Sequence, residues 1–68
     1  MKFKLSQLKE EAAKRYCSVP DKNIELFTLG EIANICRFTH DIIKADIKDI
    51  DSQWVMKRYN RKTKEISI

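Results

Sequence analysis

The sequence predicts a small α+β domain, and three observations support this prediction. The chain has 68 residues, which is the size of one domain with a single core. Apolar side chains recur at helical spacing through most of the chain. From Trp54 onward the composition changes to the β-branched and aromatic residues that are typical of strands. We therefore expect a single domain over residues 1–68 that begins with helices and ends in a β-hairpin.

The first part of the chain predicts a helix, a linker and a short strand. Residues 5–17 repeat apolar side chains at helical spacing, and Ser6 is a suitable N-cap. Residues 18–23 contain the single proline together with Asp and Asn, a composition that favours a turn. Residues 24–27, IELF, alternate and have high β propensity. These features predict a helix, a linker and a strand, in that order.

Two further helices are predicted in the centre of the chain. Thr28 and Glu31 have the spacing of a capping box, so we expect a helix over residues 29–36. Thr39 is a suitable cap for a second helix over residues 40–50. The apolar stripe of this second helix consists of Ile43, Ile47 and Ile50.

The C-terminal residues 54–68 predict a β-hairpin with a basic tip. The segments WVMKRY and TKEISI are separated by NRK, and Asn60 is the residue best able to take a positive φ in a turn without glycine. The expected buried side of the hairpin consists of Trp54, Met56, Ile66 and Ile68. The order of helix, short strand, helix, turn, helix and hairpin is that of a winged helix-turn-helix.

The charged residues are distributed unevenly along the chain, whose net charge is +4. Residues 1–16 carry five basic and two acidic side chains, residues 17–53 carry four and seven, and residues 54–68 carry five and one. A basic C-terminal segment indicates a polyanionic partner, although a solvated surface is the commoner explanation of a charge run.

Several classes of protein are not supported by the sequence. No apolar run approaches the roughly 18 residues of a membrane span, and no signal-peptide core follows Met1. Cys17, Cys36 and His40 lack the C-x-x-C pair that is typical of zinc sites. No phosphate-binding loop or nucleophile–base spacing is present. We expect a cytoplasmic non-enzyme with no metal, cofactor, small-molecule substrate or membrane partner.

The segment LGEIANICRFTHDIIKADIKDI resembles the N-terminal domain of phage regulatory proteins of the Rha type. The resemblance covers roughly residues 26–60 and departs from the family pattern at Arg37 and Phe38, where the family has Gly-Lys. The architecture is also similar to excisionases and to MerR-like winged-helix heads. This resemblance implies a DNA-binding transcription regulator, such as a phage repressor, with double-stranded DNA as its partner. The matching positions are Glu31, Ile32, Ala33, His40, Asp41, Ile43, Asp46 and Ile47.

The predicted DNA contacts fall into two groups. Helix 40–50 would read the major groove, while the basic hairpin would contact the backbone or the minor groove. The helix is an imperfect candidate, because four aspartates and two lysines lie between Asp41 and Asp51. The candidates in the helix and the preceding turn are Arg37, Thr39, His40, Lys44 and Lys48. Those in the hairpin are Lys57, Arg58, Asn60, Arg61, Lys62 and Lys64.

Two alternative functions remain open from the sequence. The acidic central helix could bind a host protein, in which case the chain would be a small phage-type interaction factor. RNA binding has less support, because no predicted strand carries paired aromatic residues for base stacking. If the partner is DNA, we expect a homodimer or tandem binding, since one such domain grips few base pairs.

Overall fold

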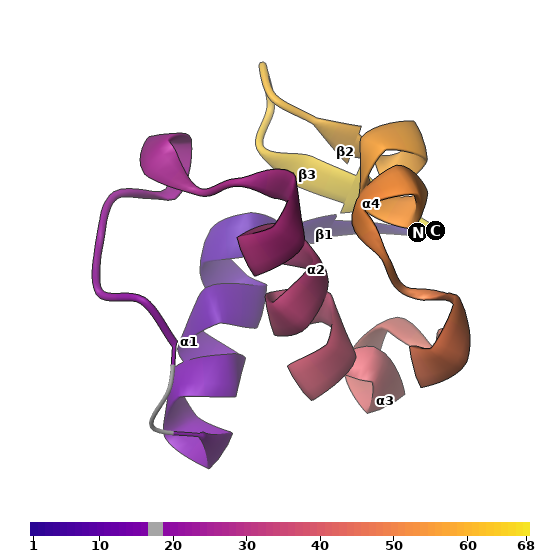
Figure 1. Ribbon diagram of the computed structural model, residues 1–68, viewed down its shortest axis with the longest axis horizontal. Coiled ribbons are helices and arrows are strands. Elements are labelled where there is room, and N and C mark those ends of the chain that lie inside the picture. The colour runs from indigo at the N-terminus through magenta and orange to yellow at the C-terminus, as the bar shows by residue number, and fades with distance from the viewer. Residues whose placement is uncertain (17–18) are drawn as a thin grey trace.

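The computed structural model describes residues 1–16 and 19–68, and it confirms the α+β class (Figure 1). Within these residues the fold consists of four α-helices, two short 3-10 turns and a three-stranded antiparallel sheet. The helices are α1 (Leu5–Arg15), α2 (Leu29–Phe38), α3 (His40–Ile43) and α4 (Ser52–Arg58). The strands are β1 (Lys2–Lys4), β2 (Tyr59–Asn60) and β3 (Glu65–Ser67), and the 3-10 turns are η1 (Ile24–Leu26) and η2 (Ile47–Asp49).

Helix α1 begins directly where strand β1 ends. The Leu5 amide donates to the Lys64 carbonyl at 3.0 Å, so the first residue of the helix is still bonded to the sheet. Lys4 is therefore the N-cap residue, and the prediction of Ser6 as the cap is wrong. Leu5, Leu8 and Ala12 are buried, which confirms the inward face that the helical spacing predicted.

The predicted strand over residues 24–27 is wrong. Residues Ile24–Leu26 form the 3-10 turn η1, because the Asn23 side chain accepts a hydrogen bond from the Glu25 amide at 3.3 Å and bends the backbone. Phe27 is buried, whereas Leu26 is 67% exposed. The strand that precedes the hairpin in the sequence is instead β1, on the other side of α1.

Helix α2 starts with the predicted capping box. The Glu31 amide donates to the Thr28 hydroxyl at 3.2 Å, and the Glu31 carboxylate accepts from the Thr28 amide at 2.9 Å. The helix runs to Phe38, two residues beyond its predicted end. Its apolar face is buried and packs against both α1 and α4, so α2 lies at the centre of the core.

The predicted recognition helix over residues 40–50 is wrong. Helix α3 is one turn long and ends at Ile43, because the next residue, Lys44, adopts a left-handed φ of 55°. Beyond it, the Asp46 carboxylate accepts from the Lys48 amide at 3.0 Å and caps η2, in place of a continued helix. Ile43 and Ile50 are buried as predicted, but Ile47 is 46% exposed.

The hairpin is shorter than predicted, because residues Ser52–Arg58 form helix α4. The Asp51 carboxylate accepts from the Trp54 amide at 2.8 Å and starts this helix. Met56 is consequently 61% exposed, whereas Trp54 packs partly buried against the core. The hairpin itself consists of β2 and β3, and the positive φ of its turn occurs at Lys64 instead of Asn60.

The sheet has the strand order β1-β3-β2. Phe3 pairs with Ile66, and Ile66 pairs with Tyr59 on its other side, so these three side chains share the inward face. The hydrogen bonds extend to the chain ends, where the Met1 amine donates to the Ile68 carbonyl at 2.8 Å. No helix among the described residues is long and apolar enough to span a membrane.

Candidate nucleic-acid interface

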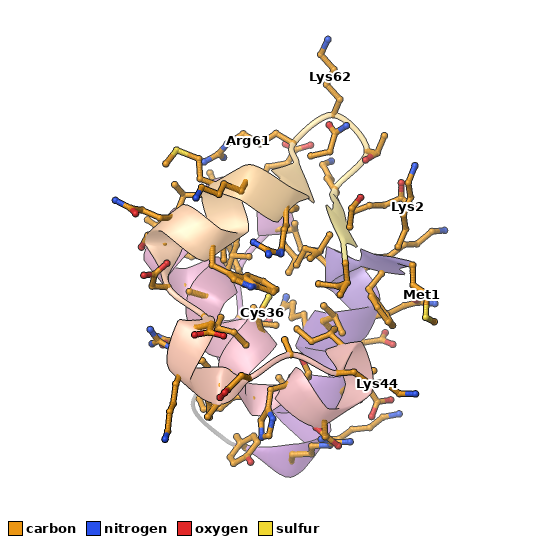
Figure 2. All side chains as sticks on the ribbon, turned by 90° about the vertical axis from the view of Figure 1, so that its right-hand side faces the viewer. Met1, Lys2, Cys36, Lys44, Arg61 and Lys62 are labelled. Carbon is orange, nitrogen blue, oxygen red and sulfur yellow. The ribbon has the colours of Figure 1, made fainter. Side chains whose placement is uncertain are left out.

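The outward face of the sheet is polar and mainly basic. Cross-strand pairs have side chains on the same side of a sheet, so the pairs Lys2–Ser67, Lys4–Glu65 and Asn60–Glu65 define this face. It carries two lysines on β1, Glu65 and Ser67 on the central strand and Asn60 on β2. The inward residues Phe3, Ile66 and Tyr59 occupy the alternate positions. Figure 2 shows Lys2 pointing away from the body of the molecule.

The turn of the hairpin is held by the Asn60 side chain. Its carbonyl oxygen accepts from the Lys62 amide at 2.9 Å and from the Thr63 amide at 3.4 Å. The Lys64 amide donates to the Asn60 backbone carbonyl at 2.7 Å and closes the turn. This arrangement exposes Arg61 and Lys62, and Figure 2 shows Lys62 at the outermost point of the turn.

A shallow depression connects the end of α4 with the hairpin. It is lined by Lys57, Arg58, Tyr59, Asn60, Arg61, Lys62 and Ser67. The Arg58 guanidinium lies 4.6 Å from the centre of the Trp54 ring, and its Nη1 donates to the Trp54 carbonyl at 3.4 Å. The depression therefore brings the cations at the end of α4 together with those of the hairpin turn, and Ser67, which pairs with Lys2 of β1, lies at its edge.

We call six of these side chains the cationic surface: Lys2, Lys4, Lys57, Arg58, Arg61 and Lys62. Within residues 1–16 and 19–68, ion pairs of up to 4.0 Å are made by Lys14, Arg15, Lys22 and Lys64. None of these four residues belongs to the cationic surface. Its six charges are therefore not neutralised by described neighbours and remain available to an anionic partner.

Lys64 is a hairpin cation that forms an ion pair within the protein. Its ammonium group lies 2.8 Å from the Glu25 carboxylate on η1. This hydrogen-bonded ion pair lowers the pKa of Glu25 and raises the pKa of Lys64. The pair ties the hairpin to the segment between α1 and α2, and it removes Lys64 from the charges that are free to bind a ligand.

The aspartates of the central segment serve mainly as caps and ion-pair partners. Asp46 caps η2 and Asp51 caps α4, while Asp41 forms an ion pair of 2.7 Å with Arg15, which lowers the pKa of Asp41. None of these three belongs to the sheet, and Asp46 and Asp51 lie in the segment that leads into the N-terminal end of α4. Asp49 and Asp51 also line a depression together with Lys57 and Arg58 of the cationic surface, so this edge of the surface is of mixed charge.

Two residues predicted to bind DNA instead have structural roles. Thr39 is 0% exposed, and its hydroxyl donates to the Ile35 carbonyl at 2.8 Å. The Arg37 Nε donates to the Ile50 carbonyl at 2.7 Å, and its Nη1 donates to Asn34 Oδ1 at 3.0 Å. Arg37 thus joins α2 to the segment before α4, and its guanidinium is largely engaged.

The remaining central candidates are separated from the hairpin. His40 and Lys44 lie at α3, and Lys48 lies on η2. Figure 2 shows Lys44 at the opposite end of the molecule from Lys62. The predicted DNA contacts therefore do not form one surface. Those of the hairpin lie together, whereas those of the central segment lie apart from them. Lys2 and Lys4, which were not among the predicted contacts, join that group through β1; the alternation of Lys2, Phe3 and Lys4 was the available signal.

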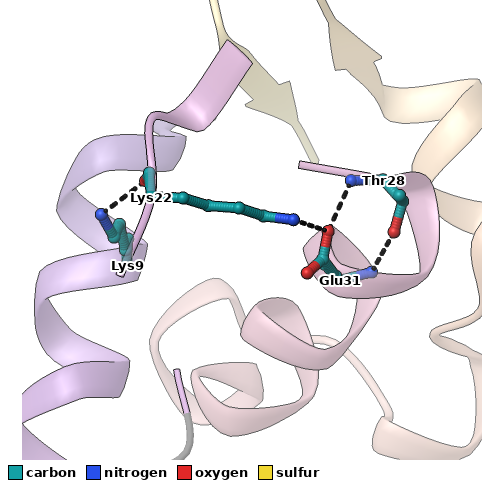
Figure 3. A network of polar contacts seen from close by, with 4 residues as sticks. All are labelled: Lys9, Lys22, Thr28 and Glu31. Carbon is teal, nitrogen blue, oxygen red and sulfur yellow. Dashed lines mark hydrogen bonds and ion pairs between the residues drawn. The ribbon is translucent and has the colours of Figure 1, made fainter. Parts of the chain in front are cut away.

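A polar network orders the segment that leads into α2 (Figure 3). The Lys22 ammonium lies 2.8 Å from the Glu31 carboxylate, which already accepts from the Thr28 amide. The Lys9 ammonium of α1 donates to the Lys22 carbonyl at 3.0 Å. The Lys22 ion pair is the main cause of the lowered pKa of Glu31. This network holds the segment against α1 and positions η1, on which Glu25 is located.

The cysteine of α2 belongs to the hydrophobic core. Cys36 is buried, and burial raises the pKa of its thiol to about 12. Cys17 lies outside the described residues. Among the described residues there is no group of three His, Cys, Asp or Glu side chains that could hold a metal ion.

Comparison with known protein families, with curated proteins and with solved structures finds no match.

Proposed function

We propose that the protein binds double-stranded DNA through the cationic surface and acts as a transcription regulator. The observation that carries the proposal is that four unpaired cations of α4 and the hairpin turn line one depression, while Lys2 and Lys4 lie on the outward face of the adjoining sheet. Phosphate contacts by Lys and Arg supply most of the non-specific affinity of DNA-binding proteins. The resemblance to Rha-type phage regulators supports the same function.

In this proposal the hairpin acts as the wing of a winged-helix variant. Support comes from the short α2–α3 pair and from the basic turn at Arg61 and Lys62. The arrangement differs from the expected one, because the third strand precedes α1 instead of following it. Helix α3 has a single turn, too short to lie along a groove, so the proposal assigns DNA contact to the sheet and the hairpin.

The salt dependence of DNA binding tests the proposal. If most of the six cations neutralise one phosphate each, the logarithm of the association constant should fall against the logarithm of the salt concentration with a slope of about −5. The double variant Arg61→Ala/Lys62→Ala should reduce this slope by about two and weaken all duplexes alike.

The double variant Lys44→Ala/Lys48→Ala is the matched control. It removes the same charge from two residues outside the cationic surface, Lys44 at the opposite end of the molecule from Lys62 and Lys48 on η2. It should leave both the slope and the affinity close to those of the parent. If the two double variants weaken binding equally, DNA does not contact the cationic surface specifically. If the parent is not retained by random duplex DNA at low salt, a protein partner becomes the better explanation.

A further inference from the structure

The outward face of the sheet contains one acidic side chain among its cations. Glu65 lies on the central strand β3, between Lys4 of β1 and Asn60 of β2. Among the described residues it takes part in no ion pair of up to 4.0 Å, even though Lys4 is its neighbour in the register. A carboxylate in this position would repel a phosphate, so phosphate attraction alone does not explain it.

The position of Glu65 in the sheet suggests a different contact. Neighbouring strands lie about 4.8 Å apart, so the backbones of β1 and β2 are separated by about 10 Å. The major groove of DNA is about 12 Å wide between its phosphate walls. If the sheet faces this groove, the cations of β1 lie toward one wall and those of α4 and the hairpin turn lie toward the other.

The central strand then faces the floor of the groove, where the bases present their edges. A carboxylate there meets the amino group of cytosine, which is the hydrogen-bond donor that Glu and Asp accept from in the major groove. Ser67 lies two residues further along the same face and can donate to or accept from a base. In this arrangement the phosphates lie to either side of β3, so the Glu65 carboxylate does not face them directly and their repulsion does not prevent binding.

We infer that β3 reads base edges in the major groove and that Glu65 is a specificity-determining residue that selects cytosine. This inference rests on the proposed DNA binding and adds to it the groove, the strand and the base. Lys2, Lys4 and the cations near the hairpin supply affinity on the two walls, whereas Glu65 and Ser67 supply the preference among sequences.

Selection of binding sites from a pool of random duplexes, followed by titration of the selected duplex and its single-base-pair variants, tests the inference. We expect the parent chain to select a site that contains a C·G pair. Glu65→Gln and Glu65→Ala should each reduce the discrimination at that pair by about five- to tenfold. Their affinity for random DNA should stay the same or rise, because a negative charge has been removed. Methylation of guanine N7, which lies in the major groove, should interfere with binding of the parent.

Glu10→Gln is the matched control, because it removes the same charge from an exposed position on α1. This variant should keep the base preference of the parent. If the Glu65 variants bind all sequences more tightly and keep the preference of the parent, the inference is overturned while DNA binding stands. If the parent binds no duplex at low salt, both the proposed function and the inference fail.

Discussion

The Glu25 carboxylate lies 2.8 Å from the Lys64 ammonium and joins η1 to the hairpin across 39 residues of sequence. Both side chains are partly exposed to solvent, and surface ion pairs of this kind contribute little to the free energy of unfolding. The pair therefore matters more for the charge that it removes from the hairpin than for stability.

Replacement of Glu25 by Gln should strengthen DNA binding. The change frees Lys64 beside the cationic surface, so the affinity for random duplexes should rise and the salt slope should steepen by up to about one. Asp21→Asn, a change at an exposed residue of the same segment, provides a control for net charge. Equal gains in the two variants would mean that only the overall charge matters and that Lys64 does not reach the DNA.

The same ion pair should make a small contribution to stability that depends on pH. Because the pKa of Glu25 is lowered from its ordinary value of 4.5, the stabilisation is present above that pH and is lost as the pH falls through the lowered value. Urea unfolding of the parent and of Glu25→Gln should therefore differ slightly at neutral pH and converge in more acidic solution. A difference between them that grows on acidification would contradict this sign.

Removal of the capping hydroxyl of α2 should destabilise the fold. In Thr28→Ala the Glu31 amide loses its acceptor, and such losses cost about 1 kcal/mol. The measurement is the midpoint of urea unfolding followed by circular dichroism. Thr63→Ala, at an exposed position in the hairpin turn, should have a much smaller effect. Comparable losses in the two variants would show that the capping box is not the cause.

Replacement of Thr39 by Val separates a structural role from a role in recognition. The variant loses the hydrogen bond to the Ile35 carbonyl and should be destabilised by roughly 1 kcal/mol or less, because that carbonyl also accepts from the backbone amide of residue 39. Its DNA affinity, measured at a temperature where the variant is folded, should equal that of the parent. If the variant instead prefers different DNA sequences from the parent, the turn after α2 contacts the bases.

The Cys36 thiol should be unreactive in the folded protein. Its pKa is raised to about 12 by burial, so almost no thiolate forms at neutral pH. In a Cys17→Ser background, iodoacetamide should modify Cys36 only after unfolding by urea. Stability should also fall as the pH rises above 9.0, because the unfolded thiol ionises there while the folded one does not. Rapid labelling without denaturant would contradict the burial.

Local signals predicted the elements that depend on a few neighbouring residues. The capping box at Thr28 and Glu31 is present, and the apolar spacing of Leu5, Leu8 and Ala12 correctly identified the inward face of α1. Both features depend on residues within one or two helical turns of each other, and the spacing of residues in the sequence is informative over that distance. The hairpin was placed correctly from Tyr59 onward, although Lys64, and not Asn60, takes the positive φ.

The errors arose where short polar side chains bond to nearby backbone amides. Asn23, Asp46 and Asp51 each accept from an amide two or three residues ahead, and these bonds end or start short helical turns that apolar spacing does not reveal. The stripe of isoleucines over residues 43–50 matched a helix, yet Asp46 interrupts it. Two of the six side chains of the cationic surface were missed for a different reason, since only pairing with β3 brings Lys2 and Lys4 beside the hairpin.

The hydrogen bond between the Met1 amine and the Ile68 carbonyl has a practical consequence for anyone who labels or immobilises this protein. A purification tag, fluorophore or surface linker attached at either end would sit next to Lys2, where it could block a ligand or add charge of its own. Attachment at the exposed Leu26, on η1, avoids the chain ends. The same proximity makes a circularised backbone attainable with a short peptide bridge.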